Sequence, residues 1–92
     1  MSMQKYKLFV LVKHTSNSIV PLEIISANLT PDFESDLVSE KVWANLMLQV
    51  RDTFSQNLNI NSLLIERANR SAEIKTPEKT IRFKIEERDI EL

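Results

Sequence analysis

Residues 38–56 read VSEKVWANLMLQVRDTFSQ, and the spacing of their apolar side chains decides the fold. These side chains recur every three or four positions, so they fall on one face of a helix with 3.6 residues per turn. The apolar face consists of Val38, Val42, Trp43, Leu46, Met47, Val50 and Phe54. The stretch therefore predicts one long helix over 38–56, with its Val42–Leu46–Val50 face buried.

The segment before this helix carries the signals of a helix start. Thr30–Asp32 combines an N-cap threonine, a proline suited to the first helical position and an acid for the first turn. Phe33 and Leu37 fall on nearly the opposite face of the helical wheel, so we expect a break or kink near Asp36. Beyond the helix, residues 57–61 predict a loop in which asparagine replaces glycine.

Two strands are expected before the helix. Tyr6–His14 is apolar on both faces in its middle, which predicts a central strand covered on both sides. A polar turn follows, in which Asn17 is the best candidate for a positive φ. Ile19–Ala27 predicts a second strand, and Pro21 places it at a sheet edge or breaks it there.

Two more strands are expected after the helix. Leu63–Ile74 begins as a strand but then loses any clear period. A turn at 76–79 leads into Thr80–Glu87, whose strict alternation predicts a strand with one buried face. The predicted order is β-β-α-β-β: a two-layer α+β sandwich, one domain over 1–92, with one long helix across a mostly antiparallel sheet.

Composition excludes several classes of site. The 92 residues contain 12 Lys/Arg and 13 Asp/Glu, a balance that argues against a generic nucleic-acid binder. The absence of cysteine excludes disulfides and thiolate chemistry, and the absence of glycine excludes glycine-rich phosphate loops. A single histidine, His14, leaves no histidine pair. We therefore expect no catalytic, metal or cofactor-binding residues, and a protein that is not an enzyme.

Targeting signals are also missing from the sequence. The apolar run at 8–12 is shorter than the h-region of a signal peptide, and no stretch approaches the length of a membrane span. We expect a soluble, cytoplasmic protein that does not bind membranes.

The charges are segregated along the chain. Residues 1–20 carry +3 and residues 21–40 carry −5. On a helix, Asp32, Asp36 and Glu40 form a stripe spaced by four. We interpret this stripe as a solvated face; a docking surface for a basic partner and a metal site are the weaker alternatives.

Counting layers leads to the main functional hypothesis. One helix covers one face of the sheet, so we expect the other face to carry Phe9 and Leu11 as an apolar patch. The chain would then be a small non-enzymatic interaction protein that contacts a protein partner or a second copy, as a homodimer, through these residues. The competing possibility is that residues 29–37 fold back as a cap over the same face.

The alternative hypothesis is a nucleic-acid-binding module that uses the second hairpin and the first strand. Its candidate residues are basic: Lys7, Lys13, Arg67, Arg70, Arg82 and Lys84.

Overall fold

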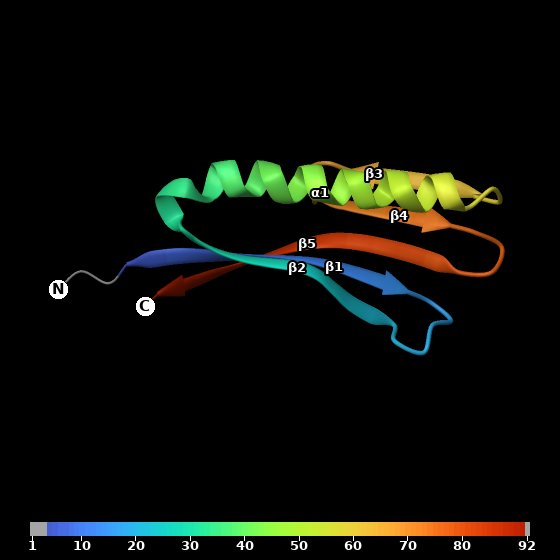
Figure 1. Cartoon of the computed structure of the whole chain (residues 1–92), viewed down its shortest axis with the longest axis horizontal. Coiled ribbons are helices and arrows are strands. Elements are labelled where there is room, and N and C mark those ends of the chain that lie inside the picture. The colour runs from blue at the N-terminus through green and yellow to red at the C-terminus, as the bar shows by residue number, and fades with distance from the viewer. Residues whose placement is uncertain (1–3, 92) are drawn as a thin grey trace.

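Within residues 4–91, which a computed structural model describes, five antiparallel strands form one sheet with a single long helix on one face (Figure 1). The elements are β1 (Lys5–Thr15), β2 (Leu22–Pro31), a 3-10 turn η1 (Asp32–Glu34), α1 (Ser35–Gln56), β3 (Ser62–Glu66), β4 (Ser71–Lys75) and β5 (Thr80–Glu91). The strand order is β2-β1-β5-β4-β3. The predicted α+β class, with an antiparallel sheet and one long helix, is confirmed.

The order of elements differs from the prediction by one strand. Residues 63–74, predicted as one uncertain strand, form the hairpin β3–β4. Arg70 closes its turn with a φ of 48°, and the Arg70 N–H donates to the carbonyl of Arg67 at 3.1 Å. Arginine rarely adopts this left-handed conformation. Because the position carries neither glycine nor asparagine, the sequence does not indicate a turn there.

The start of the helix also differs from the prediction. Thr30 and Pro31 end β2 instead of capping α1, and η1 separates them from the helix proper. Phe33 and Leu37 are more than two thirds exposed, so the predicted cap over the sheet is wrong. The predicted helix end is confirmed, because α1 stops at Gln56.

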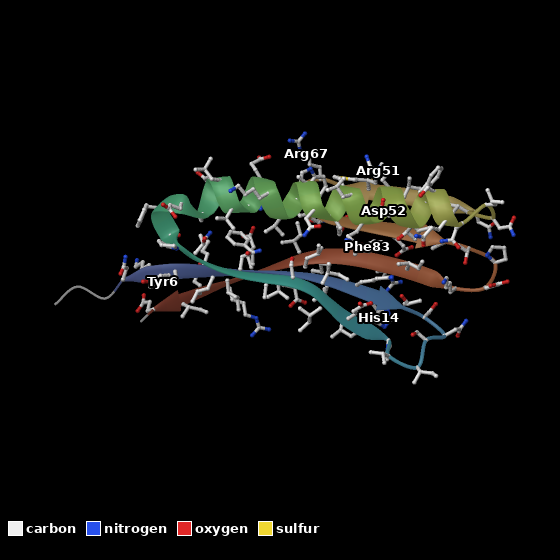
Figure 2. All side chains as sticks on the ribbon, in the orientation of Figure 1. Tyr6, His14, Arg51, Asp52, Arg67 and Phe83 are labelled. Carbon is white, nitrogen blue, oxygen red and sulfur yellow. The ribbon has the colours of Figure 1, made fainter. Side chains whose placement is uncertain are left out.

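The core lies between α1 and the sheet. The predicted helix face of Val42, Leu46 and Val50 is buried there, as are the inward side chains of β5; Figure 2 shows Phe83 in this layer. The remaining buried members are Phe9, Leu11, Ala72, Ile74, Ile81 and Ile85.

The prediction that Phe9 and Leu11 occupy the uncovered sheet face is therefore wrong. Both are at most 1% exposed and belong to the cluster under α1. Leu11 is opposite Ile85 in the β1–β5 ladder, and directly opposed residues share a face. Because the alternation of β5 places Ile85 under the helix, its partner on β1 lies there too.

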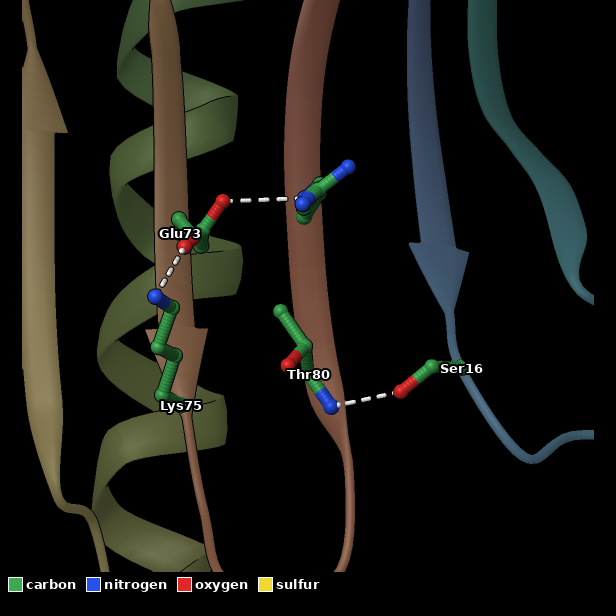
Figure 3. Close-up of polar contacts among 5 residues, drawn as sticks. Ser16, Glu73, Lys75 and Thr80 are labelled. Carbon is green, nitrogen blue, oxygen red and sulfur yellow. Dashed lines mark hydrogen bonds and ion pairs between the residues drawn. The ribbon is translucent and has the colours of Figure 1, made fainter.

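The two hairpin turns at one end of the sheet are tied together. Asn17 has the predicted positive φ, 65°, and its Nδ2 donates to the carbonyl of Glu78 at 2.7 Å. The Thr80 N–H donates to Ser16 Oγ at 2.7 Å (Figure 3), and the Ser16 N–H donates to the Thr80 carbonyl at 3.0 Å. Pro21 stands just before β2, which is the edge strand that the proline predicted.

Candidate functional site

The face of the sheet turned away from α1 is apolar along β1 and β2. Directly opposed pairs on this face are Leu8 with Leu29, Val10 with Ala27, Val12 with Ile24 and His14 with Leu22. Leu22, Ile24 and Leu29 are each more than half exposed. We call Leu8, Val10, Leu22, Ile24, Ala27 and Leu29 the apolar patch.

A β-bulge in β2 assembles this patch. The register shifts by one residue opposite the Leu11–Val12 step, so that Ile25 has no partner of its own in β1. Side chains alternate along a strand, and the extra residue reverses the alternation. Leu22 and Ile24 therefore share a face with Leu29, although their sequence numbers differ in parity. Nothing in the sequence pattern marks the bulge, so the alternation of β2 alone does not predict that Leu22 and Ile24 share a face with Leu29.

A row of charged side chains on β5 borders the apolar patch. Arg82, Lys84, Glu86 and Arg88 lie opposite His14, Val12, Val10 and Leu8, and so share their face. Arg82 Nε bonds to Glu73 Oε2 at 2.9 Å, and Lys75 Nζ lies 3.5 Å from Glu73 Oε1 (Figure 3). Within residues 4–91, Lys84 and Arg88 make no ion pair, and Glu86 lies between them on the same face, so this border carries two cations and one anion.

A shallow depression of about 520 Å³ lies farther along the same face, over β3, β4 and β5. Its carboxylates have partners: Glu73 holds Arg82, and Glu66 Oε2 accepts a hydrogen bond from Asn69 Nδ2 at 2.7 Å. With its acids engaged in this way, the depression offers no free acid and base positioned for proton transfer.

The basic residues of the nucleic-acid hypothesis do not form one surface. Lys7 and Lys13 share the helix-covered face of β1 with Phe9, whereas Arg82 and Lys84 lie on the open face. Arg70 Nη1 pairs with Glu87 Oε1 at 2.9 Å, and Arg67 lies in the β3–β4 turn. Four of these six side chains therefore lie off the face that carries the unpaired cations.

Among residues 4–91, no group of three or more histidine, aspartate or glutamate side chains is placed to hold a metal ion. Asp32, Asp36 and Glu40 are exposed, as the solvated-face interpretation expects. No helix in this range has the length and apolar character that crossing a membrane requires.

Comparison of the chain with protein-family models, curated proteins and solved structures finds no match.

Proposed function

We propose that this chain is a small, non-enzymatic, cytoplasmic interaction protein that binds a protein partner through the open face of β1 and β2. One observation carries the proposal: the apolar patch exposes Leu22, Ile24 and Leu29 along one face of the edge strand β2. Monomeric proteins rarely expose contiguous apolar patches of large size, and such patches mark interaction sites. The absence of cysteine supports the cytoplasmic assignment.

The open face is large enough for a specific contact. A standard interface takes about 800 Å² from each partner, which is roughly one eighth of the 6588 Å² surface of this chain. β1 and β2 are eleven and ten residues long, so together with the adjoining row of β5 they offer a surface of this order. Burial of the apolar part contributes about 25 cal/mol per Å² before the costs of association.

The charges bordering the patch favour a partner with complementary charges. Lys84 and Arg88 favour a partner that combines apolar side chains with carboxylates at its rim. A second copy stacked face to face about a two-fold axis across the strands would bring the β5 rows of both copies together, which disfavours that arrangement because cations would approach each other. The open face therefore suits a different, acidic protein surface.

Site-specific photo-crosslinking in the native cell tests the proposal. Benzoylphenylalanine at Ile24 should give a discrete protein adduct on irradiation. The matched control carries the same probe at Phe33, which is exposed and apolar but lies on η1. Equal adducts from both positions, or none from Ile24, would contradict the proposal. An Ile24 adduct that nuclease removes would instead favour the nucleic-acid module.

Binding measurements with the captured partner then test its chemistry. Substitution of both Lys84 and Arg88 by glutamate should slow association and reduce the salt dependence of the association rate, since rim charges act mainly on encounter. An unchanged association rate at low salt would show that the charged border plays no part.

A further inference from the structure

The edge strand β3 has features of a pairing site. All five of its residues, Ser62–Glu66, are exposed, and its three aliphatic side chains are 41–53% exposed. Natural proteins protect sheet edges with proline, bulges, charged side chains or a short strand length. β3 has no proline, lysine or bulge; its protection is limited to its five-residue length and to Glu66 at its last position. The opposite edge, β2, follows Pro21, ends at Pro31 and contains a bulge. Of the two edge strands, β3 therefore presents the more regular ladder.

The ladder pattern shows which backbone groups of β3 are free. The Ile85 N–H donates to the Arg70 carbonyl at 3.1 Å, which sets the alternation between β4 and β5. In antiparallel ladders, successive residues turn their N–H and C=O groups to alternate sides. Counting along β4 from this bond, Glu73 turns toward β3, so its partner Leu64 turns inward. The outward N–H and C=O groups of β3 are those of its second and fourth residues, Leu63 and Ile65.

We propose that β3 pairs antiparallel with β3 of a second copy, with Leu64 opposite Leu64 across a two-fold axis. In this register, the outward backbone N–H and C=O groups of Leu63 face those of Ile65 from the other copy. It therefore forms four backbone hydrogen bonds and joins two five-stranded sheets into one.

The other symmetric registers of this strand are worse. Centring the pair on Leu63 uses Asn61, but the Asn61 N–H already donates to the Lys75 carbonyl at 2.7 Å. Centring it on Ile65 sets the charged Arg67, which lies in the turn, opposite Leu63. The Leu64 register opposes Glu66 with Ser62, so no like charges face each other. Hydrogen bonding and charge thus favour the Leu64 register over the other symmetric registers of a β3–β3 pair.

The flank of α1 beside β3 supplies further apolar surface. Val38, Lys41 and Asn45 of α1 line a depression together with Asn28 and Thr30 of β2. At 100° per residue, the flank on the other side of the helix points toward β3. It carries the apolar Trp43, Met47 and Phe54 together with the charged Asp36 and Glu40.

This flank and the adjoining loop raise the area available to a dimer. A stable dimer takes about 800 Å² from each copy, more than a five-residue strand provides alone. Phe54 is 52% exposed, and Leu58, in the loop that leads into β3, is 97% exposed. Both side chains therefore add to the surface that a second copy covers.

This dimer leaves the partner-binding face free. A two-fold axis perpendicular to the joined sheet keeps both open faces on the same side, and each apolar patch stays far from β3, because β2 and β3 are opposite edges. Self-association and partner binding thus use separate surfaces, and each can fail without the other.

Cysteine trapping of the full chain tests the register. The natural sequence has no cysteine, so Leu64→Cys introduces a single thiol on the proposed axis. The two Leu64 residues form a non-hydrogen-bonded pair, whose Cα atoms lie about 4.5 Å apart, within disulfide range. Leu64→Cys should therefore oxidise to a covalent dimer. The matched control, Leu29→Cys, has the same 53% exposure on the other edge strand and should stay monomeric. Equal rates of crosslinking would overturn the proposal.

Sedimentation supplies the second readout. At about 100 μM, wild type should sediment at twice the chain mass of 10.7 kDa. Ile65→Pro removes an outward N–H without touching the β3–β4 ladder, and should give a folded species of single-chain mass. Leu29→Lys, also in the apolar patch, should remain dimeric, and the same substitution in a chain that carries the probe at Ile24 should abolish the partner adduct. Wild type at single-chain mass would overturn the proposal; if Ile65→Pro does not fold, the cysteine pair decides.

Discussion

Leu46→Ala tests the helix–sheet core directly. Leu46 is fully buried at the middle of α1, between Val42 and Val50. Losing its side chain forfeits the transfer free energy of the removed groups, and also leaves a cavity that the helix and sheet fill only partly. We expect a loss of about 3 kcal/mol in the free energy of unfolding, within the usual range of about 2–5 kcal/mol. A chain of 92 residues has about 5–14 kcal/mol in total, so the variant stays folded but is much weakened.

Urea titration and thermal melting followed by circular dichroism measure this loss. For a domain of this size, about 3 kcal/mol corresponds to a fall of roughly 12–24 °C in Tm. Leu37→Ala is the matched control, because it makes the same change in the same helix at a side chain that is 71% exposed. The control should change stability by less than about 0.5 kcal/mol. If both variants melt within a degree or two of wild type, α1 does not pack on the sheet through this face.

Three further predictions concern local features. Ser39→Ala should raise the free energy of unfolding by about 1 kcal/mol in urea, because Ser39 Oγ is buried without a hydrogen-bond partner and alanine is the better helix former; a loss of stability would show that the hydroxyl has a partner. Asn17→Ala should have a free energy of unfolding about 1–2 kcal/mol below that of Asn17→Gly, since both lose the amide contact but only alanine brings a Cβ to a φ of 65°; equal stability of the two variants would contradict this. Treatment with a chelator should leave the circular dichroism spectrum and Tm unchanged, and a clear loss of structure would refute folding without metal.

The sequence was most informative where a pattern ran for many residues. The apolar period of 38–56 extends over five turns, and it predicted both the buried face of α1 and its end at Gln56. The strict alternation of 80–87 likewise predicted which side chains of β5 point inward. Asn17 was predictable for a different reason: a chain without glycine has few residues that tolerate a positive φ.

Short features escaped prediction because their causes are not local in the sequence. The turn between β3 and β4 depends on Arg70 in a left-handed conformation, which residue preferences disfavour. The bulge at Ile25 is fixed by the pairing of β2 with β1 and by burial of Ile25 against the core. Thr30 and Pro31 resemble a helix start, but the long pairing with β1 extends β2 through both residues.

The candidate site shows most clearly what depends on topology. Counting one helix against one sheet correctly implied an uncovered face, but β1 is apolar on both sides, so its own pattern does not say which set of side chains faces the helix. That choice follows from the partner strand. β1 pairs with β5, and Leu11 and Ile85 are eight tenths of the chain apart in sequence; because Ile85 lies under α1, the odd-numbered residues of β1 lie there too. The even-numbered set, with Leu8 and Val10, is thereby left on the open face. Which side chains of a central strand lie on the open face therefore depends on the long-range pairing, and it can be predicted only once that pairing is known.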